Sequence, residues 1–213
     1  MMSRDARHMG GLELVDLSDD ELAAAAAVGD AEAFAVLIRR MSPVLLRYMR
    51  RMVSDRQVAE DLAQETLLDT WKALPDFGFR SSFRTWMFAV AHRKTVDHHR
   101  RRRDLPVSDE RFAELSANGP EPADSAEHSA LMDALRAELE NLPYTSRAAW
   151  WLKEVEGLTI DEVAQVLRVS NGSVRGHLQR SRKFLVVRLA PWQPGAQPSD
   201  DERSSDRGRG DRS

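Results

Sequence analysis

Residues 158–185, LTIDEVAQVLRVSNGSVRGHLQRSRKFL, contain the pattern that decides the fold. Thr159, with Glu162 three residues later, forms a capping box that satisfies free amides at the start of a short helix. Ser170 is well suited to cap a second, longer helix after a tight turn. Two capped helices at this separation are typical of a helix-turn-helix motif. We therefore predict a compact helical DNA-binding unit in the second half of the chain.

The second helix of this motif separates its apolar and polar residues onto two faces. Val174, Leu178, Ser181 and Leu185 recur at helical spacing and are expected to pack against the first helix. The other face is basic, and Arg and Gln can pair with base edges while further cations meet phosphates. The candidate contacts to DNA are Gly172, Ser173, Arg175, Gly176, His177, Gln179, Arg180, Arg182 and Lys183. A solvated basic helix on an ordinary bundle is the less favoured alternative.

The rest of the chain predicts an all-α protein with two small helical domains. Ser129–Leu142 is amphipathic and ends at Pro143, and the helix after it stops at Gly157. Residues 104–128 are rich in Pro and carboxylates and are expected to form a flexible acidic linker. The predicted organisation is a disordered arm (1–17), a first domain (18–103), this linker, a helix-turn-helix domain (129–190) and a disordered tail (191–213).

The first domain reads as a series of helices with distinct faces. Ser18 and Glu21 predict a capped start, Pro43 is expected to begin a new helix, and Asp55 to open the next. Residues 75–82, PDFGFRSS, predict a loop that ends in two possible caps. Residues 83–103 then predict one helix with an aromatic start and a basic end.

Composition limits the possible functions. The net charge of −3 hides two basic segments: residues 93–103 hold six Lys and Arg against one acid, and residues 170–188 hold five and no acid. Clustered cations of this kind favour phosphate binding at two separate places. The absence of cysteine excludes disulfides and thiol chemistry, and the scattered histidines predict no metal site and no cofactor. With no apolar run of about 18 residues and no apolar signal core, we expect a cytoplasmic protein without membrane insertion.

Two passages resemble a known family. AEDLAQETLLDTW (59–71) and SSFRTWMFAVAHRKTVDHHRRR (81–102) look like conserved region 2 of bacterial sigma factors. LENLPYTSRAAWWLKEVEGLTIDEVAQVLRVSNGSVRGHLQRSRKFL (139–185) looks like their region 4. Both occur in the family's order, and only the linker and the two ends remain unmatched. Because no additional folded region is visible, the resemblance is to the small extracytoplasmic-function (ECF) subfamily of the sigma-70 family.

The resemblance implies a non-catalytic subunit that directs core RNA polymerase to promoters. It implies docking on the clamp coiled coil and the flap of the large polymerase subunits, with the clamp contact made by Asp61, Gln64, Glu65 and Asp69. Carboxylates spaced three and four apart form one stripe on a helix, which agrees with that role. It implies that the helix-turn-helix binds the −35 element. Residues implied at the −10 element and its single strand are Phe77, Gly78, Phe79, Arg80, Ser81, Ser82, Arg84, His92, Arg93, Lys94, Arg100 and Arg101.

The chain departs from the family pattern at one position, since Arg93 stands where an Asn is common. Arg cannot accept a hydrogen bond as Asn can, so its role is expected to shift toward phosphate. The family also implies an anti-sigma factor as a partner. For the linker, mimicry of nucleic acid in the polymerase channels and a simple tether both stay open.

Two other classes of function remain as alternatives. A plain transcription regulator would use the helix-turn-helix without polymerase, although no ligand-binding or receiver domain is visible. A nuclease would need Asp97, His98 and His99 to share a metal, but adjacent histidines point to different sides of a helix.

Overall fold

The computed structural model describes residues 14–103 and 126–192, and in these ranges it is built from helices with no strand. The predicted all-α class is confirmed. The first unit contains α1 (Asp19–Ala27), α2 (Ala31–Met52), α3 (Arg56–Ala73), the 3-10 turn η1 (Leu74–Asp76) and α4 (Phe83–Arg103). The second contains α5 (Ala126–Glu140), α6 (Tyr144–Trp150), the π-helical turn η2 (Trp151–Val155), α7 (Ile160–Leu167), α8 (Asn171–Arg188) and the 3-10 turn η3 (Ala190–Trp192).

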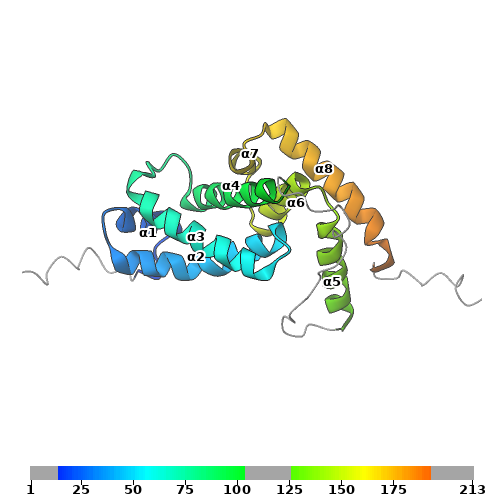
Figure 1. Cartoon of the computed structure of the whole chain (residues 1–213), viewed down its shortest axis with the longest axis horizontal. Coiled ribbons are helices and arrows are strands. Elements are labelled where there is room, and N and C mark those ends of the chain that lie inside the picture. Colours follow the sequence, from blue (N-terminus) through cyan, green and yellow to red (C-terminus); the bar gives the residue numbers. More distant parts are fainter. Residues whose placement is uncertain (1–13, 104–125, 193–213) are drawn as a thin grey trace, which may run out of the picture.

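Helix α4 lies at the centre of the molecule, between the remaining helices of the first unit and the helix-turn-helix of the second (Figure 1). It contributes Phe83, Met87 and Phe88 to the core, all completely buried. Its opposite end carries the basic segment. The predicted single helix over residues 83–103 is confirmed, and the core runs without a break from one unit into the other.

The chain caps its helices as the sequence indicates. Ser18 and Glu21 form a capping box at α1, and Thr159 and Glu162 form another at α7. Asp55 accepts bonds from two amides at the start of α3, and Ser170 accepts one at α8. The predicted starts of these helices are therefore confirmed, because each rests on a contact within three residues.

The prediction that Pro43 begins a helix is wrong. α2 runs unbroken from Ala31 to Met52 with Pro43 inside it. The reason is the long apolar face of α2, on which Leu37, Met41 and Leu45 are buried. Proline removes one helical hydrogen bond, and burial of that face on both sides of it outweighs the cost.

The predicted ends of the elements shift in several places. α5 begins at Ala126 instead of Ser129, and the chain continues from α6 through η2 to a left-handed turn at Gly157, with φ +73°. In the predicted arm, the last residues are held, because Arg40 donates hydrogen bonds to the carbonyls of Val15 and Leu17 at 2.5 and 2.7 Å. The rest of the arm, most of the linker and the tail after Trp192 lie outside the described residues.

None of the helices in these two ranges is long and apolar enough to cross a membrane.

The capping box of α7 generates a stability prediction. Thr159→Ala removes the oxygen that accepts from the Glu162 amide at 3.2 Å, and we expect it to lower the free energy of unfolding by about 1 kcal/mol. Thr159→Ser keeps that oxygen and should lie close to the wild type. Urea unfolding followed by circular dichroism measures the difference, and equal losses in both variants would contradict the capping role.

Candidate nucleic-acid interface

The basic face of α8 is exposed and faces away from the core. Val174, Leu178 and Leu185 are buried on the other face, as the sequence predicts. Of the candidate contacts to DNA, Gly172, Ser173, Arg175, Gln179, Arg180, Arg182 and Lys183 are exposed, whereas Gly176 and His177 are half-buried. The structure therefore places most of the predicted residues on the outer surface of the helix-turn-helix, while Gly176 and His177 are partly covered.

Three of these residues, Gly176, His177 and Arg182, also take part in contacts within the protein. A Cβ atom at Gly176 would lie 3.3 Å from Nη1 of Arg180, so the glycine leaves room for that guanidinium to lie against the helix. The Arg182 guanidinium pairs with Glu154 at 2.7 Å. His177 is turned toward α6, where its Nδ1 lies 2.9 Å from Ser146 Oγ, and burial together with Arg180 lowers its pKa.

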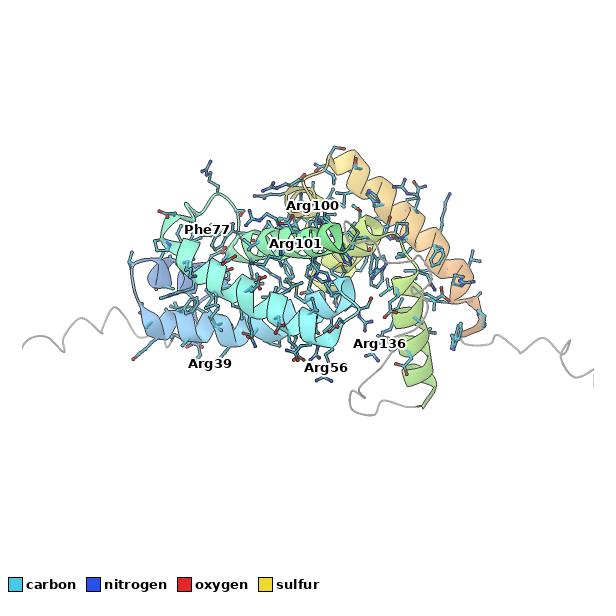
Figure 2. All side chains as sticks on the ribbon, in the orientation of Figure 1. Arg39, Arg56, Phe77, Arg100, Arg101 and Arg136 are labelled. Atoms are coloured by element: carbon cyan, nitrogen blue, oxygen red, sulfur yellow. The ribbon has the colours of Figure 1, made fainter. Side chains whose placement is uncertain are left out.

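The loop before α4 forms an aromatic surface. Phe77 stacks on Trp86 with ring centroids 4.4 Å apart, and Phe79 lies 4.8 Å from Phe77. Phe79 is 44% exposed and adopts a left-handed backbone, with φ +49°. Figure 2 shows Phe77 on the side of this loop, and Arg100 and Arg101 further along α4. Gly78 and Arg80 are exposed, and Ser81 and Ser82 are half-buried.

The start of α4 is covered by the second unit. Arg84 forms an ion pair with the buried Glu156 at 2.5 Å, and Glu156 also accepts from Trp151 Nε1 at 3.0 Å. Glu162 accepts hydrogen bonds from Thr85 at 2.8 Å and from Ser82 at 3.3 Å. Two predicted DNA contacts, Ser82 and Arg84, are therefore held by the helix-turn-helix unit in this arrangement.

A buried polar cluster joins the two units further along α4. The Nδ1 atom of His92 lies 3.0 Å from Tyr48 Oη and 3.4 Å from Tyr144 Oη, and Tyr144 is also bonded to Thr95. Burial lowers the pKa of His92 to about 4 and raises that of Tyr144 to about 12. The placement of His92 at the DNA surface is corrected by this arrangement: the side chain is buried between the units, because it shares the inner face of α4 with Phe88 and Thr95.

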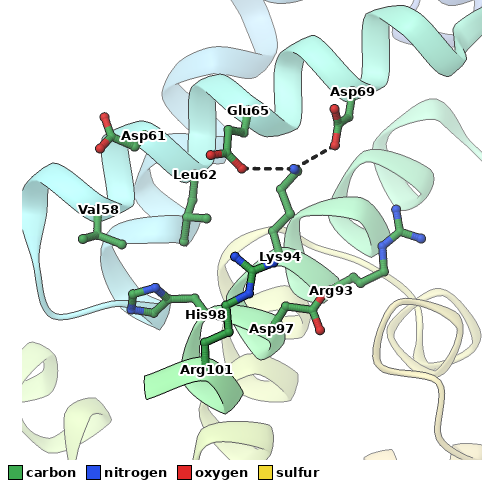
Figure 3. Close-up of a pocket in the computed structure, with 10 residues that line it drawn as sticks. All are labelled: Val58, Asp61, Leu62, Glu65, Asp69, Arg93, Lys94, Asp97, His98 and Arg101. Atoms are coloured by element: carbon green, nitrogen blue, oxygen red, sulfur yellow. Dashed lines mark hydrogen bonds and ion pairs between the residues drawn. The ribbon is translucent and has the colours of Figure 1, made fainter. Parts of the chain in front are cut away.

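Three of the remaining predicted cations of α4, Arg93, Lys94 and Arg101, face α3 across a groove of about 450 Å³ (Figure 3). Arg93 and Arg101 are exposed on its α4 wall, and Arg100, also exposed, pairs with Asp97 at 3.3 Å. On the α3 wall lie Asp61, Glu65 and Asp69. These three residues form the predicted carboxylate stripe, Gln64 lies beside them on α3, and all four side chains are exposed.

Lys94 connects the two walls of this groove. Its ammonium lies 2.7 Å from Asp69 and 3.2 Å from Glu65, and Figure 3 shows it between the two carboxylates. The Lys94 hydrogen bond lowers the pKa of Asp69. Burial opposes the charge on Lys94, but its bonds to Asp69 and Glu65 prevail and raise its pKa.

The residues that join the two units are not among those predicted from the sequence. Glu156 and Glu162 come from the second unit, and their partners on α4 lie more than 70 residues earlier in the chain. The short-range patterns of a single sequence carry no signal for such pairs. Among the described residues no group of three or more His, Asp or Glu side chains could hold a metal ion.

Comparison with known proteins agrees with this geometry. Residues 37–104 match the family model for sigma-70 region 2, and residues 132–185 match that for sigma-70 region 4. The RNA polymerase sigma-H factor of Pseudomonas aeruginosa is 30% identical over 84% of this chain and 97% of its own length. The ECF RNA polymerase sigma factor SigC of Mycobacterium tuberculosis is 31% identical, over 82% and 95%.

A solved structure supports the fold assignment. CnrH in complex with the cytosolic domain of CnrY has a TM-score of 0.60 and 28% identity, and the match covers 81% of this chain and 98% of the matched one.

Together these features define a helical, two-unit protein with a polymerase-docking and a promoter-binding part. The chain belongs to the sigma-70 family of RNA polymerase sigma factors, and its relatives include ECF members. It therefore binds core RNA polymerase, recognises the −35 and −10 promoter elements and promotes DNA melting.

The buried position of His92 predicts that stability depends on pH. Its folded pKa of about 4 lies below the ordinary value of 6.5, so the unfolded chain binds a proton first and stability falls as pH drops from 6.5 toward 4. This group alone should lower the free energy of unfolding by about 2 kcal/mol between pH 7 and pH 5. Urea titrations at both values measure the loss. His92→Gln should show a smaller one, and an unchanged loss in that variant would contradict the assignment.

Proposed function

We propose that this sigma factor docks on the clamp coiled coil of the polymerase through the carboxylate stripe of α3. The observation that carries the proposal is the exposure of Asp61, Gln64, Glu65 and Asp69 on one side of a helix packed beside α4. An acidic stripe fits a basic partner helix and steers its approach. A plain regulator that acts without polymerase would have no use for such a stripe beside its DNA-binding helix.

For the −10 element, the proposed binding surface is the loop of residues 77–82 and the exposed cations of α4. Single-stranded DNA is held by aromatic rings that stack on bases and by cations that meet phosphates. Phe79 offers an exposed ring beside Phe77, and Arg80 and Arg93 lie exposed on the loop and α4. Binding energy spent on the opened strand would drive melting without covalent chemistry, so the chain acts as a non-catalytic subunit.

For the −35 element, the proposed reader is the outer face of α8, with Arg175, Gln179, Arg180 and Lys183 exposed on it. The second unit would also contact the flap of the polymerase. Both activities place the protein in the cytoplasm, where the polymerase acts.

The arrangement described above, in which the second unit is packed against α4, corresponds to the chain before it binds DNA. Ser82 and Arg84 of the −10 surface are bonded to Glu162 and Glu156 of the second unit. The two promoter elements lie far apart along the duplex, so one unit cannot stay against the other when both are bound. Polymerase would separate the units, and an anti-sigma factor would bind the chain and prevent this. The solved complex of CnrH with the cytosolic domain of CnrY shows that a similar chain binds a protein partner, which supports the proposal.

Transcription tests the docking stripe. In run-off assays with core polymerase and a library of promoters, Asp61→Arg/Glu65→Arg should lower specific transcripts about tenfold or more, because repulsion replaces attraction at the clamp. Glu32→Arg changes an exposed charge on α2 and serves as the matched control. Equal transcripts from the double variant and the control would overturn the docking assignment. Transcription absent even with the wild type, together with tight binding to duplex DNA, would favour a plain regulator.

Separation of the units can be followed by energy transfer between two labels. The chain has no cysteine, so Glu32→Cys on α2 and Val187→Cys on α8 give two unique attachment points. The transfer efficiency should change when core polymerase is added, because the units part. Unchanged transfer in a complex that transcribes would contradict the proposed opening.

A further inference from the structure

Lys94 lies on α4, the helix proposed to bind DNA, but its ammonium is paired with two residues of the carboxylate stripe of α3. Its side chain is 18% exposed, whereas those of Glu65 and Asp69 are 61% and 50% exposed. The ammonium therefore lies beneath two carboxylates that face solvent, at 3.2 and 2.7 Å. Neighbouring cations on α4 differ from it: Arg93 acts on Asp69 only through its charge, without the hydrogen bond that Lys94 makes, and Arg101 lies exposed on the same wall of the groove.

These contacts place Lys94 between the carboxylates that the clamp helix is proposed to bind and the surface of α4 that is proposed to bind DNA. A basic helix that approaches Glu65 and Asp69 brings a second positive charge close to Lys94, and like charges at such a distance repel each other. The two carboxylates are more exposed than the Lys94 ammonium, so an incoming cation can form ion pairs with them from the solvent side. Lys94 then loses its two partners and keeps a long, mobile side chain with three hydrogen-bond donors.

The released ammonium would have a natural new partner. Lys94 lies on the wall of the groove that also carries Arg93 and Arg101, and all three side chains come from α4. A DNA backbone that follows this wall would offer phosphate oxygens to each of them. Because Lys94 is charged in both settings, the exchange replaces one ion pair by another and needs no change of protonation.

We propose that Lys94 couples polymerase docking to promoter binding: a basic clamp helix that takes Glu65 and Asp69 releases Lys94 to bind the phosphates of the opened strand. The inference rests on the proposed docking of α3. It goes beyond that proposal because it gives one residue the task of linking the two binding events. By linkage, DNA that takes Lys94 must strengthen clamp binding by the same factor.

The test measures this coupling with the full-length chain. The probes are a fragment of the clamp coiled coil and a fluorescent single-stranded oligonucleotide that carries a −10 element. For each variant, the oligonucleotide's dissociation constant is measured by anisotropy with and without saturating clamp fragment, and the ratio gives the coupling factor. In the wild type we expect the fragment to tighten DNA binding about tenfold, within the usual range for coupled sites.

Three variants distinguish the proposed coupling through Lys94, called the relay below, from a role of Lys94 in DNA binding or folding alone. Lys94→Gln should bring the coupling factor close to one while the clamp fragment binds as tightly as before or more tightly. Arg93→Gln, the matched control on the same helix, should weaken DNA binding in both states and keep the coupling. Asp69→Asn should release Lys94 in advance and tighten DNA binding by the free chain, a gain that misfolding cannot imitate.

The outcomes also distinguish this inference from the docking proposal. If Glu65→Arg binds the clamp fragment as the wild type does, the docking assignment has failed, and the relay fails with it. If Glu65→Arg loses the fragment but Lys94→Gln keeps wild-type coupling, docking stands and the relay is overturned. A wild-type coupling factor of one, with docking intact, would also overturn the relay.

Discussion

The buried ion pair between Glu156 and Arg84 is the interaction on which the arrangement of the two units depends. The Glu156 side chain is only 1% exposed and is held by both Arg84 and Trp151. A carboxylate so deeply buried is tolerated only because its charge is neutralised and its oxygens are bonded. Removing Arg84 from it would leave an unpaired charge in the interior. The pair therefore fixes where α7 can lie on α4, and the hydrogen bonds of Glu162 follow from that placement.

Helix α4 has three sides, and each makes a different set of contacts. One side fills the core of the first unit with Phe83, Met87 and Phe88. A second side meets the helix-turn-helix, and the third carries cations toward α3 and solvent. A helix with this many partners cannot move in one place without a response elsewhere. The proposed docking on α3, the contact with α7 and the proposed binding of DNA would thus be connected through a single helix.

The local features of this fold could be predicted from the sequence, and the contacts between the units could not. Capping by Ser18, Thr159 and Ser170 follows from residues three positions apart, and the structure has all of it. The prediction at Pro43 is wrong because burial of the apolar face of α2 outweighs the preference of proline for the first turn of a helix. The burial of His92 had a signal, since it stands four residues after Phe88 on one face of α4. Glu156 had none, because its partner belongs to another unit.

The seam between the units contains a polar cluster in which the side chains of His92, Tyr48, Tyr144 and Thr95 are joined by hydrogen bonds. When two apolar surfaces part, water must cover them at a cost proportional to their area. Hydroxyl and imidazole groups instead gain hydrogen bonds with water that replace those they lose. At these positions the separated units would therefore expose groups that can form hydrogen bonds with water. Parting of the units would thus cost less at this polar cluster than along the apolar core that the two units share.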